Sequence, residues 1–147
     1  MSGLMVLRSG LPGVALAACV MFASPVFAET VSFKADLKAS EEVPPNDSKA
    51  TGTVTATYDT ASKKLTWKGN YSGLTGPATM AHFHGPAEPG KNAGVAVPIT
   101  PSASPFENSA NLTDAQAADL LAGRWYVNVH TGAHPGGEIR GQLVKGM

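Results

Sequence analysis

The stretch ATGTVTATYDTASKKLTWKGNYSGL, residues 50–74, decides the fold of this 147-residue chain. Threonine, valine and aromatic residues fill its two halves, and the polar segment DTASKK separates them. These residue types favour strands, and a polar break between two such runs is typical of a hairpin. The stretch therefore predicts two antiparallel strands joined by a short turn.

Further strand-like runs lie on both sides of this hairpin. VSFKADLKA, residues 31–39, alternates apolar and polar positions, which is the period of a half-buried strand. Similar short runs follow the hairpin at 78–84, 93–100, 105–112, 124–131 and 137–145. Seven or eight short strands in a chain of this length predict an all-β fold, an antiparallel sandwich or barrel.

One short helix is expected at residues 112–123. Thr113 and Gln116 have the spacing of a capping box, and Gly123 ends the run. The leucines at 112, 120 and 121 predict that this helix covers an edge or an end of the strand layers.

The first 28 residues predict a secretory signal peptide. Arg8 is the only charged residue before Glu29, and a long apolar run follows it. Small residues at 26 and 28 give the pattern of a cleavage site, so we expect a periplasmic or secreted domain at 29–147. The apolar run contains Gly13 and Pro25 and has no charged stop, so no retained membrane span is expected.

A rival interpretation concerns LAAC, residues 16–19, which resembles a bacterial lipobox. In that case Cys19 would be the lipidated first residue of an anchored lipoprotein. The residues after Cys19 remain apolar, whereas a lipoprotein tether is polar, so the soluble exported form is preferred.

Composition and motifs exclude several classes of protein. The chain has 11 basic and 11 acidic residues with no basic cluster, so no nucleic-acid partner is expected. Its single cysteine is Cys19, so residues 29–147 cannot form disulfides and need an ordinary hydrophobic core. The sequence contains no nucleophile elbow, phosphate loop or H-E-x-x-H motif.

The histidines fall into two short windows, and the first is MAHFHGPAEP, residues 80–89. Positions i and i+2 of a strand share a face, so His82, His84 and Met80 share one face. Ala81 and Phe83 take the opposite face and are expected in the core. Two imidazoles so spaced can converge on one metal ion.

The second window is VNVHTGAHPGG, residues 127–137. The same alternation puts Trp125, Val127 and Val129 on one face, and Tyr126, Asn128 and His130 on the other. His134 follows in a glycine-rich loop that can return its side chain toward His130.

These two windows predict a metal site whose ligands are His82, His84, His130 and His134. The alternative is that the first pair belongs to a solvated strand face and the second pair to a loop. Imidazole ligands suit copper and zinc, and Met80 would add a soft ligand. Copper is therefore the first choice and zinc the second, although Met80 is more simply explained as a packed or surface residue.

The remaining charged pairs favour structural roles. Glu41 and Glu42 are adjacent, so on a strand they face opposite ways, which is a poor arrangement for paired acid–base chemistry. Glu138 and Arg140 are two residues apart and are expected to point inward as hydrogen-bonded partners.

Three stretches together resemble the CHRD domain, a module named after chordin and found in bacterial exported proteins. They are residues 39–59, 74–87 and 125–143, in the order of the family. The resemblance matches its E-E-V-P-P element to 41–45 and its H-x-H-G pair to His82 and His84. Its closing element supplies His130, Glu138 and Arg140, whereas His134 lies outside the pattern.

This resemblance implies a Greek-key β-sandwich similar in outline to copper–zinc superoxide dismutase. The four histidines are too few for a complete copper–zinc site. We therefore expect an exported metal-binding domain, with copper as the leading ion. The alternatives are a non-enzymatic structural module that binds a protein partner and, as a third choice, a copper-only dismutase-like enzyme. The sequence leaves open whether the domain catalyses a reaction, and a non-enzymatic role is preferred.

Overall fold

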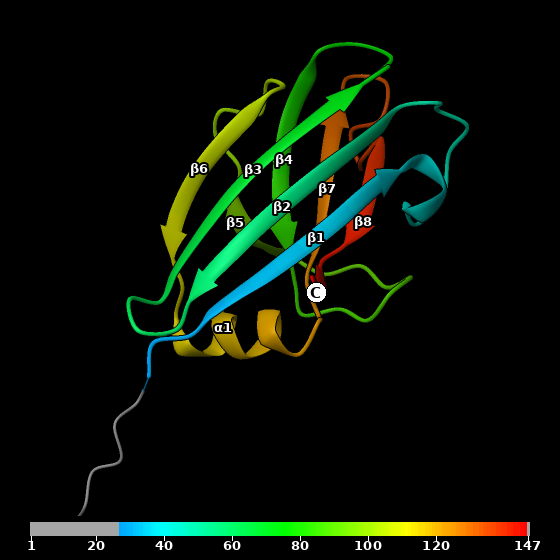
Figure 1. The fold of residues 1–147 in the computed structure, drawn as a ribbon. Coiled ribbons are helices and arrows are strands. Elements are labelled where there is room, and N and C mark those ends of the chain that lie inside the picture. The colour runs from blue at the N-terminus through cyan, green and yellow to red at the C-terminus, as the bar shows by residue number, and fades with distance from the viewer. Residues whose placement is uncertain (1–26, 147) are drawn as a thin grey trace, which may run out of the picture.

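The computed structural model describes residues 27–146, and strands dominate this part of the chain (Figure 1). The strands are β1 (Thr30–Lys38), β2 (Thr51–Asp59), β3 (Lys64–Ser72), β4 (Ala78–His84), β5 (Val95–Pro98), β6 (Phe106–Asn111), β7 (Tyr126–Thr131), β8 (Ile139–Gln142) and β9 (Val144–Lys145). They are accompanied by the short 3-10 helix η1 (Ala39–Glu41) and the helix α1 (Asp114–Leu121). The all-β prediction is confirmed, and the two-residue β9 takes the described count to nine.

The strands form one antiparallel sheet in the order β5-β4-β7-β8-β1-β2-β3-β6, with β9 beside β1. Strands β1, β2, β3 and β6 make one layer in Figure 1, and β4, β5, β7 and β8 lie behind it. The two layers join through Lys38 of β1, which pairs with Arg140 of β8. The other side is open between β5 and β6, so the sheet is a nearly closed sandwich.

The hairpin predicted at 50–74 is formed by β2 and β3, which pair continuously from Thr51↔Ser72 to Asp59↔Lys64. The Asp59 carboxylate caps the turn by accepting hydrogen bonds from the Ser62 amide (2.7 Å) and hydroxyl (2.8 Å). Short polar side chains that bond to nearby backbone amides favour turns in this way.

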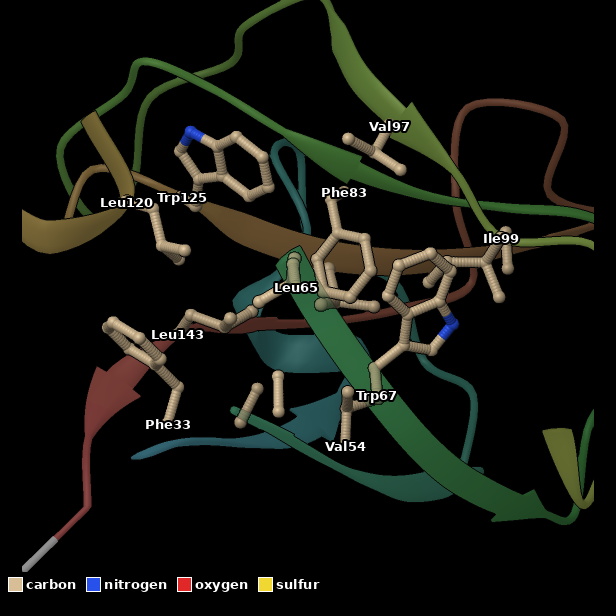
Figure 2. Packing of buried hydrophobic residues seen from close by; sticks show 14 of the residues in the cluster. Phe33, Val54, Leu65, Trp67, Phe83, Val97, Ile99, Leu120, Trp125 and Leu143 are labelled. Carbon is tan, nitrogen blue, oxygen red and sulfur yellow. The ribbon is translucent and has the colours of Figure 1, made fainter. Parts of the chain in front are cut away.

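The hydrophobic core lies between the two layers (Figure 2). Trp67 of β3 packs edge-on against Phe83 of β4, with ring centroids 5.1 Å apart. Phe83 also packs against Trp125, with centroids 5.9 Å apart. Ala81, Phe83, Trp125, Val127 and Val129 are all buried, as the alternation predicted. Burial of each large side chain stabilises the fold by about 1.5–3 kcal/mol.

Helix α1 begins with the predicted capping box and lies across one end of the sandwich (Figure 1). Thr113 Oγ1 accepts from the Gln116 amide (3.2 Å), and Gln116 Oε1 accepts from the Thr113 amide (3.0 Å). Leu120 of the helix is completely buried, and Leu112, just before the helix, is 4% exposed. Within 27–146 no helix has the length and apolar character to cross a bilayer.

The signal peptide expected at 1–28 and the lipobox cysteine Cys19 lie almost wholly outside the described residues. Export and the position of cleavage therefore stay predictions from the sequence.

Candidate metal centre

The outer face of β4, β7 and β8 carries a buried layer of polar side chains. In the strand register Met80 lies opposite His130, His82 opposite Asn128, and Asn128 opposite Arg140. Asn128, His130 and Arg140 are 3%, 6% and 2% exposed. The alternation predicted which residues share this face. His84 is 8% exposed and His82 is half-buried, so the alternative of a solvated face fits only the end at Met80, which is 47% exposed.

Three segments without regular strands, residues 39–48, 85–94 and 132–137, cover this polar layer. The side-chain amide of Asn92 donates to the Val43 carbonyl (3.0 Å) and so links the first two segments. The Asn46 side-chain amide donates to the Glu138 carbonyl (3.0 Å) and fixes the first segment to the chain just before β8.

His82, His84 and His130 converge. One ring nitrogen from each lies within 4.8 Å of the others. His82 Nδ1 is 3.1 Å from His130 Nε2. An adjustment of about 1 Å brings such nitrogens to the roughly 3.4 Å spacing of tetrahedral ligands. Three of the four residues predicted from the strand alternation therefore lie together in the structure.

Backbone carbonyls orient two of these rings. His130 Nδ1 is 2.9 Å from the Pro135 carbonyl oxygen, and His84 Nδ1 is 3.0 Å from the Ala93 carbonyl oxygen. A carbonyl only accepts, so a hydrogen on Nδ1 satisfies it and leaves Nε2 as the lone-pair nitrogen, which is the tautomer that a metal ligand needs. Metal-binding histidines commonly donate their other N–H to a carbonyl in the same manner.

The environment also favours uncharged imidazoles. Burial lowers the pKa of His82, and the neighbouring His130 and His84 lower it further. Burial is likewise the main reason that the pKa of His84 is lowered, although its bonds to Ala93 and Asn128 oppose the shift. A neutral imidazole is the form that binds a metal ion.

His84 belongs to a stack of three side chains, with Tyr126 and Arg140. Its ring lies parallel to that of Tyr126, with an interplanar angle of 3° and centroids 4.8 Å apart. The Arg140 guanidinium covers the Tyr126 ring, with Cζ 3.5 Å from the centroid. Arg140 donates to Asn92 Oδ1 (2.9 Å) and to the Lys91 carbonyl (2.6 Å), and so anchors the segment that bears Ala93.

Glu138 is buried, but its role is structural. Its carboxylate accepts from Ser48 Oγ (2.6 Å), Thr131 Oγ1 (2.7 Å), Thr75 Oγ1 (2.8 Å) and the Thr75 amide (2.9 Å). Desolvation opposes ionisation, but these hydrogen bonds outweigh it and lower the pKa of Glu138 to about 2. Glu138 and Arg140 are both buried, but the prediction that they bond to each other is wrong, because they belong to separate hydrogen-bond networks.

Glu42 is 5% exposed, whereas its neighbour Glu41 lies at the surface. Within residues 27–146 the Oε1 atom of Glu42 has no hydrogen-bond partner. Desolvation raises the pKa of Glu42 to about 7, and the Arg140 charge and the Asn128 amide oppose this rise. A methyl group at Gly137 would clash with this carboxyl, so glycine leaves the space that the Glu42 side chain occupies.

His134 lies outside the group of three histidines. It is half-buried, and its carbonyl accepts from the Gly137 amide (3.0 Å) in the turn after β7. It lines a hollow of about 250 Å³ together with Glu42 and Pro44. Met80 shares the face of His82 as predicted and is 47% exposed.

Asn128 is the residue at this centre to which the sequence assigned no role. Its Oδ1 lies 2.9 Å from His84 Nε2. The alternation placed it on the face of His130, but an asparagine within a strand gives no metal-ligand signal by itself. The signal was its register position opposite His82, which is known only once β4 and β7 are paired.

The family model of the CHRD domain matches residues 33–143. This range contains every strand of the outer polar face and all the histidines. No curated protein and no solved structure matches the chain.

Proposed function

The chain belongs to the CHRD domain family, and for this member we propose an exported metal-binding function, with copper as the first ion and zinc as the second. The observation that carries the proposal is the convergence of His82, His84 and His130 within 4.8 Å. The carbonyl bonds to Pro135 and Ala93 support it, because they direct Nε2 of two rings away from the backbone.

The ligand type supports the choice of ion. Imidazole nitrogens suit copper and zinc, and the part of the chain after residue 28 contains no cysteine thiolate. On binding, His82 would exchange its hydrogen bond to His130 Nε2 for a bond to the ion. The proposal is one of binding and includes no reaction.

Export is the second part of the proposal. The apolar, charge-poor segment before Glu29 supports cleavage after Ala28 and a periplasmic or secreted location. An anchored form with lipidated Cys19 is the alternative.

Isothermal titration of the purified protein with copper(II) and with zinc(II) at neutral pH tests the binding function. We expect one ion per chain and a loss of binding in His82→Ala and His130→Ala. Thr57→Ala, on the exposed face of the other layer, is the matched control and should bind like the parent. If the parent binds neither ion, the metal function is wrong.

A protein-interaction function is the second candidate. A shallow hollow of about 620 Å³ lies over β2, β3 and β6, and its lining includes Thr55, Thr66, Lys68 and Glu107. In the sheet, β8 and β1 separate these strands from β4 and β7, which carry the histidines. A protein partner could therefore bind at this hollow whether or not an ion is bound at the histidines. If no ion binds, charge reversal at Lys68 and Glu107 in a pull-down from the periplasm tests this candidate.

A further inference from the structure

His84 has an oxygen opposite each of its two ring nitrogens. Nδ1 faces the Ala93 carbonyl at 3.0 Å, and Nε2 faces Asn128 Oδ1 at 2.9 Å. In a neutral ring one hydrogen faces two oxygens that only accept, so one ring nitrogen must point its lone pair at an oxygen lone pair. A cation bound by His84 Nε2 and Asn128 Oδ1 removes this conflict, because Nδ1 then keeps the hydrogen for the Ala93 carbonyl.

The surroundings of Asn128 fix which end of its amide faces His84. Its Nδ2 points to the Gly136 carbonyl (3.4 Å). Nδ2 also lies beside the buried Glu42 carboxyl, because a methyl group built on Gly137 would touch both. Both neighbours of Nδ2 accept hydrogen bonds, so the nitrogen belongs on that side and the oxygen on the side of His84.

The spacings match those of ligands that share an ion. Two atoms bound at about 2.0–2.1 Å lie roughly 2.9 Å apart at a right angle and roughly 3.4 Å apart at a tetrahedral angle. The His84 Nε2–Asn128 Oδ1 distance is 2.9 Å, and the His82 Nδ1–His130 Nε2 distance is 3.1 Å. The register also places Asn128 directly opposite His82.

We propose that Asn128 Oδ1 is the fourth ligand of the metal centre, and that Glu42 is the positioning residue that keeps this oxygen directed at the ion. This inference rests on the proposed metal function and deepens it. Three imidazole nitrogens and one amide oxygen form a donor set for a divalent ion, copper(II) or zinc(II), rather than for copper(I), which prefers sulfur ligands. Met80 and His134 are then not ligands.

The parent protein provides the first test. Zinc(II) is diamagnetic, so the side-chain ¹³Cγ signal of Asn128 can be followed by NMR in protein labelled at asparagine. We expect this signal to shift on saturation with zinc(II), while that of Asn70, an exposed residue of β3 in the other layer, stays in place. A parent that binds zinc(II) with an unmoved Asn128 signal would overturn the inference and leave a three-histidine site.

Variants provide the second test, with zinc(II) titration and the copper(II) electron paramagnetic resonance spectrum as readouts. Asn128→Leu should weaken zinc(II) binding about tenfold or more and change the copper(II) spectrum. Asn128→Asp retains the oxygen and adds charge, so it should bind at least as tightly as the parent. Glu42→Gln retains the shape of the positioning residue and should produce a smaller loss than Asn128→Leu, with the parent spectrum retained.

Met80→Leu and His134→Ala are the matched controls, because they remove the two competing fourth ligands. Both should bind like the parent and give its spectrum. If either changes the spectrum while a folded Asn128→Leu does not, that residue is the fourth ligand and the inference is wrong. Should Asn128→Leu fail to fold, the NMR experiment on the parent decides. A parent that binds no ion refutes the proposed function as well, so the two failures are distinguishable.

Discussion

The guanidinium of Arg140 lies against the ring of Tyr126, with Cζ 3.5 Å from the ring centroid, although neither residue is exposed to more than 3%. A cation over a ring in a site without water is stabilised more strongly than at a surface. The other face of the same ring packs against His84. The buried cation is therefore linked, through one aromatic ring, to a candidate metal ligand.

The first prediction concerns this stack. Arg140→Leu leaves Asn92 Oδ1 and the Lys91 carbonyl without their donors, so it should lower the free energy of unfolding by about 2–4 kcal/mol. Urea denaturation measures this change. The control is Lys34→Gln, which removes an exposed ion pair with Asp36 and should change stability by less than about 1 kcal/mol. Equal effects in the two variants would show that the stack does not stabilise the fold.

The second prediction ranks the histidines. His82→Ala, His84→Ala and His130→Ala should each weaken copper(II) binding by more than about tenfold, because each removes a converging nitrogen. His134→Ala should cost clearly less, because His134 lies outside the group of converging nitrogens. Isothermal titration of the four variants measures the ranking, and equal losses at all four positions would contradict it.

The third prediction is that the ion stabilises the folded state. A ligand that binds only the folded chain, at a hundredfold excess over Kd, adds about 2.7 kcal/mol of stability. The melting temperature should therefore rise with copper(II) at pH 7. Burial lowers the pKa values of His82 and His84 below the ordinary 6.5, so the rise should persist to lower pH than at a site of ordinary histidines. It should shrink as the pH falls further, because a protonated imidazole does not bind a metal ion. A rise that stays the same across the whole acid range would contradict imidazole ligands.

The fourth prediction concerns acid stability and Glu138. Its folded-state pKa of about 2 lies below the ordinary 4.5, so ionised Glu138 favours the folded state above pH 4.5. This contribution, on the order of 3 kcal/mol, is lost as the pH falls from 4.5 toward 2. Glu138→Gln should therefore be less stable than the parent at pH 6, and the difference should shrink through that window. Parallel stability curves from pH 6 to pH 2 would contradict the assignment.

The fifth prediction concerns export. Processing after Ala28 gives a chain that begins at Glu29, and intact-mass measurement of periplasmic material identifies that first residue. A diacylated species that begins at Cys19 would establish the lipoprotein form instead.

The strands could be predicted because the alternation of apolar and polar residues is visible within each short stretch of sequence. Alternation in β4 and β7 placed Phe83 and Val127 in the core and His82 and His130 on the opposite face, and the structure agrees on each. The capping box of α1 was equally local, because it needs only Thr113 and Gln116. Features that depend on neighbours in sequence were therefore the ones that sequence reasoning recovered.

The burial of the polar face could not be predicted in the same way. Segments 39–48 and 85–94 show no regular alternation of apolar and polar residues, so their sequence does not indicate which face of the sheet they cover. Their contacts also join residues far apart in the chain, such as Asn92 and Val43. Glu42 is buried without a hydrogen-bond partner for Oε1 because these segments cover the face. Asn128 lies beside His84 because β4 pairs with β7. Both required the tertiary structure.

The three histidines differ in exposure, so one side of the centre is more open to solvent than the other. His84 and His130 are 8% and 6% exposed, whereas His82 is half-buried and lies next to the exposed Met80. In the proposed metal site, an ion that arrives from solvent would therefore meet His82 first and the two inner rings only afterwards. Departure would follow the reverse order, with His82 as the last protein ligand.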